Sequence, residues 1–220
     1  MTTRDLKARV LEAAHGAPSA TRGTSRVQAW LVLPSSVIVA ASLFFALGGV
    51  QNGQGRPMWF YLASSLGWGA VAALSTWGAL GRGASATWRT RSILVAVAIG
   101  TPAVLFAMMF AFATADPELT QVHPERLGLK CLGLTVAAAT FPLLSLLAVR
   151  RGSDPVHPAA TGAALGAACG ASAGVMVEMW CPVSELRHVA FGHIAPIVLL
   201  ALVGAALGSR VLGMRARGRR

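Results

Sequence analysis

Three cysteines and a group of histidines and glutamates are the residues of this sequence best suited to chemistry. Cys131 and Cys181 each lie at one end of a long apolar segment, whereas Cys169 lies inside one. Two thiols at the same depth, on an oxidising face, could form a disulfide. The alternative is that both are small, fairly apolar side chains at helix ends, and the sequence leaves both interpretations open. Cys169 lies roughly 18 Å from Cys181 along a helix, so we assign it to packing.

Histidines and glutamates with metal-binding side chains flank the same cysteines. They are His123, Glu178, Glu185, His188 and His193. Cysteine and histidine are ligands for zinc or copper, but the spacing here matches no compact zinc motif. We therefore predict no metal ion and no cofactor, and name His188 and His193 as the candidates for a metal ligand. The alternative interpretation is that these polar residues simply face water.

The elements that would position these residues are six apolar blocks. Of the 220 residues, 55% are hydrophobic and only 12% are charged, which is about half the charged fraction of a soluble domain. Each block is close to the length of about 20 residues that a helix needs to cross a bilayer. The blocks are 29–50, 60–81, 92–114, 131–149, 159–179 and 189–209. We therefore expect an all-α integral membrane protein, a bundle of six transmembrane helices within residues 29–212.

The basic residues are divided unevenly between the two sides of such a bundle. Most of the 19 Lys and Arg residues fall in the segments on the side of the two termini. Cytoplasmic segments carry such an excess, so both termini, including the basic tail 213–220, should face the cytoplasm. A net charge of +11 suggests nucleic acid in a soluble chain. Here topology accounts for the charge, and we expect no direct contact with nucleic acid.

Four glycines recur at every fourth residue of the fifth block. They are Gly162, Gly166, Gly170 and Gly174. Residues four apart share one face of a helix, and small residues let helices approach closely within a bilayer. We expect the fifth span to be the packed centre of the bundle, with the sixth span and its Gly204 and Gly208 as one partner. An interface in a homodimer is the alternative use of this face.

Residues 1–28 form a polar segment that contains the run "TTRDLKARVLEAAH". This run predicts a short cytoplasmic amphipathic helix, on which Leu6, Val10 and Leu11 would lie close together on one face. A helix this short is marginal in water. It would gain order by docking into the groove of a partner protein or by lying on the membrane surface.

The apolar blocks lack the features of a catalyst or of an ion-coupled transporter. Ionisable groups at mid-membrane mark transport pathways, whereas the polar groups at that depth here are small hydroxyls such as Ser65, Ser75 and Thr135. No metalloprotease helix, nucleophile elbow or phosphate-binding loop is present, and no C-x-x-C pair. We therefore expect a protein that is not an enzyme, and a small membrane transporter or channel is the alternative function.

From Cys131 onward the sequence resembles the NrsF family of bacterial inner-membrane anti-sigma factors. The likeness is carried by the fourth block with its leading cysteine, the "RRG" connection, the "HPAATGAALG" entry into the fifth block and the "CP" turn after it. The closing "GAALGSRVL" is also similar to family carboxyl ends. The sequence departs from the family at Val183, where an acid is expected, and at Gly192, where tryptophan is common.

The resemblance implies a partner, a location and a mode of control. It implies a protein of the bacterial inner membrane that holds an extracytoplasmic-function sigma factor through its amino-terminal segment, here through Leu6, Val10 and Leu11. It also implies that Cys131 and Cys181 are the family's paired cysteines, tied to a stress or redox response. The sigma factor would then be released on an envelope, oxidative or light-linked signal, by conformational change or by proteolysis.

Overall fold

The described part of the chain is built from helices alone. The computed structural model describes residues 5, 38–46, 48, 57–80, 91–120, 128–151 and 157–212. The expected docking residues Leu6, Val10 and Leu11 and the basic tail 213–220 therefore lie outside the described residues.

The helices follow the apolar blocks of the sequence. Residues 38–46 are helical, and the remaining elements are α3 (Met58–Leu80), α4 (Arg91–Ala115), the 3-10 turn η1 (Pro117–Thr120), α5 (Leu129–Val149), α6 (Pro158–Trp180), α7 (Leu186–Val189), the π-helical turn η2 (Ala190–Ile194) and α8 (Ala195–Val211). The long helices begin and end within about one turn of the blocks. α7, η2 and α8 follow one another without a break over Leu186–Val211.

Four of the described helices are long and apolar enough to cross a membrane. They are Arg91–Ala115, Leu129–Val149, Pro158–Trp180 and Leu186–Val211, with mean hydropathies of 2.4, 2.1, 1.5 and 2.2. The prediction of six spans goes beyond these four. The block 60–81 corresponds to α3, which is not among them, and the block 29–50 is described only in part. Every element among the described residues is thus a helix, and the count of six spans stays a prediction.

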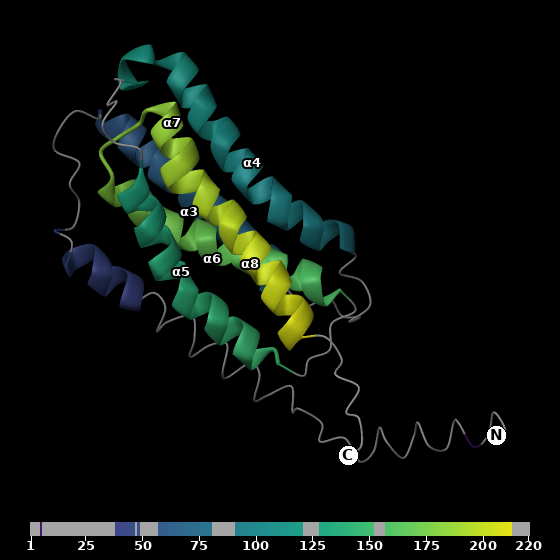
Figure 1. The fold of residues 1–220 in the computed structure, drawn as a ribbon. Coiled ribbons are helices and arrows are strands. Elements are labelled where there is room, and N and C mark those ends of the chain that lie inside the picture. The colour runs from purple at the N-terminus through teal and green to yellow at the C-terminus, as the bar shows by residue number, and fades with distance from the viewer. Residues whose placement is uncertain are drawn as a thin grey trace.

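α6 is the central helix, and it packs against α3, α4, α5 and α8 (Figure 1). In its most apolar 18 residues 78% are buried, against 28% for α4 and 33% for α5. The surrounding helices instead present large apolar side chains to the outside, among them Leu66, Trp77, Ile99, Leu144 and Leu202. Soluble monomers rarely expose so much apolar surface, so the outer face of this bundle is suited to lipid.

α6 and α8 meet backbone to backbone along a contact that we call the glycine seam, made of Gly162, Gly166, Gly204 and Gly208. A Cβ added to Gly162 would overlap the carbonyl oxygen of Gly204 and stand 2.9 Å from the Cα of Gly208. A Cβ added to Gly166 would overlap the carbonyl oxygen of Leu200. The two helices can therefore approach this closely only because these positions have no side chain.

The next two glycines of the same row have different neighbours, α8 at Gly170 and an indole ring of α3 at Gly174. A Cβ on Gly170 would stand 3.1 Å from the Cα of Ile197 in α8. A Cβ on Gly174 would overlap the indole ring of Trp68 in α3, which is fully buried. The row of glycines on α6 thus turns from α8 toward α3 as it approaches the end of the helix, and the next turn carries the polar groups described below.

Candidate functional site

The start of α5 lies directly on η2, and two glycines make this contact possible. Gly128, which precedes α5, has φ of 75°, in the left-handed region that glycine adopts without strain. A Cβ on Gly128 would stand 2.9 Å from the Cα of Gly192, and a Cβ on Gly192 would stand 3.1 Å from the Cβ of Cys131. This close approach brings Cys131, in the first turn of α5, beside the histidines of the last long helix.

His188 and His193 are five residues apart, yet their rings lie together. On a regular α-helix, positions five apart point roughly 140° away from each other. The π-helical turn η2, Ala190–Ile194, changes this because its i to i+5 hydrogen-bond pattern widens the turn and brings such positions onto one side. The two ring centroids are 5.6 Å apart, with the ring planes at 63°. The π turn is therefore what aims both imidazoles at one point.

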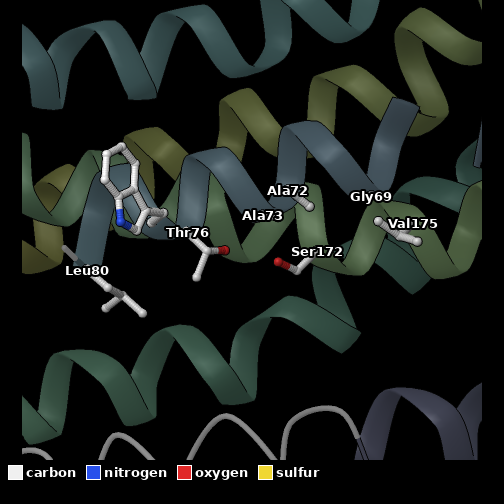
Figure 2. Close-up of a pocket in the computed structure, with 8 residues that line it drawn as sticks. Gly69, Ala72, Ala73, Thr76, Leu80, Ser172 and Val175 are labelled. Carbon is white, nitrogen blue, oxygen red and sulfur yellow. The ribbon is translucent and has the colours of Figure 1, made fainter. Parts of the chain in front are cut away.

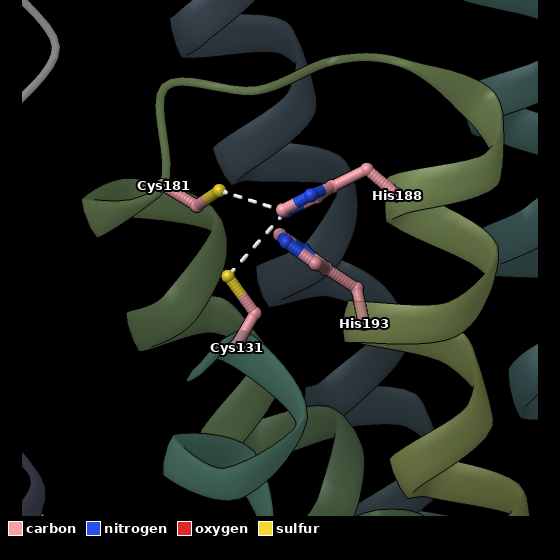
Figure 3. A group of neighbouring side chains, drawn as sticks. All are labelled: Cys131, Cys181, His188 and His193. Carbon is pink, nitrogen blue, oxygen red and sulfur yellow. Dashed lines mark hydrogen bonds between the residues drawn. The ribbon is translucent and has the colours of Figure 1, made fainter. Parts of the chain in front are cut away.

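Cys131, Cys181, His188 and His193 form a compact group that we call the Cys/His cluster. One potential ligand atom from each lies within 4.8 Å of the other three, and all four side chains are buried (Figure 3). The Nε2 atom of His188 lies 3.4 Å from the sulfur of Cys131 and 3.2 Å from the sulfur of Cys181. Both cysteines are free thiols. Four segments of the chain, the start of α5, the end of α6, α7 and η2, thus converge on one polar centre.

Two further side chains hold the ring of His193 in place. The Oε2 atom of Glu178 lies 3.1 Å from its Nδ1 atom, and both side chains are fully buried. The indole of Trp68 meets the ring edge-on, with 6.0 Å between centroids and 67° between planes. The other ring nitrogen, Nε2, is buried as well, and the ring lies beside Cys131, Cys181 and His188. The carboxylate on one nitrogen therefore fixes the ring orientation and leaves the second nitrogen for the cluster.

Cys181 lies just after α6, between two of the long apolar helices, and its thiol is activated. Its pKa is lowered far below the ordinary value for cysteine, chiefly by the hydrogen bond with Cys131 and further by those with His188 and His193, while burial acts in the opposite direction. The thiolate is the form of cysteine that reacts with oxidants and binds metals. The cluster thus favours the reactive form of this sulfur.

The structure sorts the sequence candidates into two groups. Cys131, Cys181, His188 and His193 come together, and Glu178 joins them. Cys169 is buried in α6 among apolar residues and lies outside the cluster. Glu185 precedes α7 and is half-buried, and His123 lies outside the described residues. The interpretation that the polar residues of this end simply face water is wrong for Glu178, His188 and His193, which are at most 4% exposed.

Sequence reasoning missed Glu178 as the partner of His193 and missed the convergence of the two histidines. A signal for the first was present, because Glu178 is the one charged residue within α6 and a lone ionisable group in an apolar helix marks a functional site. The second had no local signal. Positions five apart differ by roughly 140° on a regular α-helix, which is too far for two side chains to meet at one point, and nothing in the sequence announces the π turn.

A hollow on the side of the bundle, away from the Cys/His cluster, carries no comparable chemistry. It is an open depression between α3 and α6, lined by Gly69, Ala72, Ala73, Thr76, Trp77, Leu80, Ser172 and Val175 (Figure 2). Apart from two hydroxyls and one indole, its lining is apolar. A surface of this kind suits the packing of lipid or of another apolar segment, and it presents no titratable side chain.

In the part of the chain that the structure describes, long apolar helices suit a bilayer, and reactive side chains gather near one end of them. The family model described as NrsF, negative regulator of sigma F, matches residues 13–213, and the chain belongs to this family. No curated protein and no solved structure matches the chain. Family membership supports negative regulation of a sigma factor, with that sigma factor as partner, and thus a regulatory role.

Proposed function

We propose that this protein is a membrane-bound anti-sigma factor that holds an extracytoplasmic-function sigma factor at the cytoplasmic face of the bacterial inner membrane. The observation that carries the proposal is the NrsF match, which extends over residues 13–213 and therefore over every described helix from α3 to α8. Four helices of bilayer-crossing length support the membrane location. A sigma factor held in this way is kept from RNA polymerase.

The amino-terminal segment 1–28 is the proposed docking element. Leu6, Val10 and Leu11 precede the region that the family model matches, so their proposed role in docking rests on the amphipathic pattern of the segment. A short apolar helix face that is marginal alone becomes ordered when it lies in a hydrophobic groove of a partner. The positive-inside distribution of Lys and Arg supports a cytoplasmic position for this segment, which is where a sigma factor is found.

Cys131 and Cys181 are the proposed sensor, and an oxidising envelope signal is the one that their chemistry favours. Their sulfurs lie within 4.8 Å of each other, and a hydroperoxide oxidant would accept two electrons and two protons as the two thiols form one disulfide. The new bond is only about 2.05 Å long, so the sulfurs must move together and leave His188. This shifts the start of α5 against the end of α6, and the rigid helices carry the movement toward the docking segment.

The docking proposal is tested with the full-length protein and a reporter gene under the control of the sigma factor. Leu6→Asp, Val10→Asp and Leu11→Asp each place a charge on the proposed apolar face. We expect each to weaken docking about tenfold or more, since a buried unpaired carboxylate is costly, and to switch the reporter on without a signal. Ala8→Asp is the matched control for Leu6→Asp and Val10→Asp, because Ala8 points roughly 160° away from both Leu6 and Val10 on the helix.

The level of each variant in the membrane is measured alongside the reporter. Full repression by all three Leu and Val variants at normal protein levels would contradict docking through this face. An equal loss of repression in the Ala8→Asp variant would show that charge in the segment, and not the apolar face, is what matters.

A further inference from the structure

We propose that the Cys/His cluster is a binding site for one Zn²⁺ ion, with the sulfurs of Cys131 and Cys181 and one ring nitrogen each of His188 and His193 as its four ligands. This inference goes beyond the proposed function and does not depend on it, because it concerns the reduced protein in the absence of any sigma factor. It assigns a role to every polar group of the cluster.

The distances within the cluster are close to those of a tetrahedral zinc site. Zinc binds thiolate sulfur at about 2.3 Å and imidazole nitrogen at about 2.0–2.1 Å, which places neighbouring ligand atoms of a tetrahedron roughly 3.3–3.8 Å apart. The two sulfurs already lie 3.4 and 3.2 Å from the Nε2 atom of His188. Since no pair of ligand atoms is more than 4.8 Å apart, rotation of the side chains by small amounts completes the tetrahedron.

The ligand set and its burial select the metal and the type of site. Two thiolates and two imidazoles suit zinc, whereas magnesium and calcium prefer oxygen ligands. All four side chains are buried, with exposed fractions of 4% or less. A site with four protein ligands and no open position is of the structural type and not the catalytic type, in agreement with a regulatory protein.

The surroundings of His193 are those of a metal ligand. Ligating histidines nearly always give their second ring nitrogen to a carboxylate or carbonyl, which fixes the tautomer and the ring orientation. Here the Oε2 atom of Glu178 lies 3.1 Å from Nδ1 of His193, and Trp68 packs against the ring. The Nε2 atom, which is also buried, is then the ring nitrogen left for the ion.

Zinc would also balance the charge of the buried cluster. A single nitrogen of His188 lies 3.4 and 3.2 Å from the two sulfurs, so one ion could contact all three groups and His193 together. Two thiolates with one Zn²⁺ are electrically neutral, which avoids the cost of an uncompensated buried charge.

The test uses the full-length protein purified in detergent under reducing conditions and freed of metal with a chelator. Co²⁺ is added first, because a tetrahedral cobalt–thiolate site gives strong visible and near-ultraviolet absorption, and Zn²⁺ is then added to displace it. We expect one Co²⁺ per chain, displacement by one Zn²⁺, and loss of the signal in Cys131→Ala, Cys181→Ala, His188→Ala and His193→Ala. Cys169→Ala is the matched control and should bind cobalt as the parent protein does.

A second measurement guards against variants that fail to fold. The unfolding midpoint of the parent protein is recorded with and without Zn²⁺, and a ligand that binds only the folded state must raise it. A folded parent protein that shows neither the cobalt spectrum nor a zinc-dependent rise in the midpoint would overturn the proposal. So would a cobalt signal that falls as much in Cys169→Ala as in Cys131→Ala.

Discussion

The glycine seam and the Cys/His cluster both involve α6, and they hold the molecule together in opposite ways. In the seam, Gly162 and Gly166 lie against the backbone of α8, and the contact exists because side chains are missing. In the cluster, side chains from α5, α7, η2 and the end of α6 reach into a common centre. The seam therefore tolerates no added volume but offers no chemistry, whereas the cluster offers chemistry and depends on the identity of each polar atom.

Breaking the seam with one methyl group is the change with the largest expected effect. In Gly166→Ala the new Cβ overlaps the carbonyl oxygen of Leu200, and a backbone atom cannot rotate away as a side chain can. We expect a loss of about 3 kcal/mol or more in the free energy of unfolding, at the upper end of overpacking effects. Unfolding of the purified protein by denaturant in detergent micelles measures it.

Gly133→Ala is the matched control for this change. Gly133 lies inside α5, and a Cβ there meets nothing within 4 Å. Alanine is the better helix former by roughly 0.5–1 kcal/mol, so this variant should be as stable as the parent protein or slightly more so. If Gly166→Ala and Gly133→Ala unfold alike, the backbone contact between α6 and α8 is not what holds them together.

The two regions also differ in how far the sequence predicts them. The row Gly162, Gly166, Gly170 and Gly174 is a local pattern within one block, and its period alone predicts a flat helix face. The cluster brings Cys131 to residues some 50 to 60 positions later in the chain. That contact depends on the close approach of Gly128 to Gly192, which no local pattern encodes.

The histidines show a second limit of sequence reasoning. The apolar block 189–209 predicts a regular helix, and the helix over Leu186–Val211 is present, but the π turn inside it is not predicted. Because the π turn η2 rotates His193 toward His188, the site depends on a backbone irregularity that composition and periodicity do not predict. The helical class of the protein is therefore readable from the sequence, and the polar centre is readable only in part.

In the cluster, the expected effect of a minimal change is smaller and is electrostatic. Glu178→Gln keeps the size of the side chain but removes the charge next to Nδ1 of His193. We expect a loss of about 2 kcal/mol in the free energy of unfolding, the usual contribution of a hydrogen bond to a charged group. Glu185→Gln, at a half-buried position without a side-chain cap bond, should change stability by less than about 0.5 kcal/mol. Equal effects of the two substitutions would contradict a special role for Glu178.

The contact between Gly128 and Gly192 shares features of both the glycine seam and the Cys/His cluster, because it is a backbone contact that positions a polar site. A Cβ at residue 192 would stand 3.0 Å from the carbonyl oxygen of Gly128 and 3.1 Å from the Cβ of Cys131, so α5 and η2 need to separate by only a few tenths of an ångström. Gly192→Ala should therefore cost about 1 kcal/mol. It should nevertheless weaken cobalt binding, while Gly166→Ala should mainly lower the yield of folded protein. Unchanged cobalt binding in a folded Gly192→Ala variant would show that this contact does not set the cluster geometry.

The smallest expected effect concerns a polar contact in the apolar body of the bundle, between Ser75 of α3 and Thr101 of α4. Their hydroxyl oxygens are 2.6 Å apart, and the Thr101 hydroxyl donates to the carbonyl oxygen of Val97 at 2.6 Å. Because Thr101 has one hydroxyl proton, Ser75 must be the donor in the pair. Ser75→Ala then leaves Thr101 bonded and should cost only about 0.6 kcal/mol, the average for such contacts between helices in membranes.

Thr101→Val should cost more than Ser75→Ala, since it removes the acceptor and leaves the buried Ser75 hydroxyl without this partner. The double variant Ser75→Ala with Thr101→Val should recover part of that loss, and a thermodynamic cycle of the four proteins measures the coupling. Equal losses of stability in the two single variants would contradict Ser75 as the donor of this hydrogen bond. A coupling energy as large as the effect of Glu178→Gln would mean that a neutral hydroxyl pair contributes as much to stability as the charged partner of His193. The polar end of the molecule and its apolar body would then not differ in this respect.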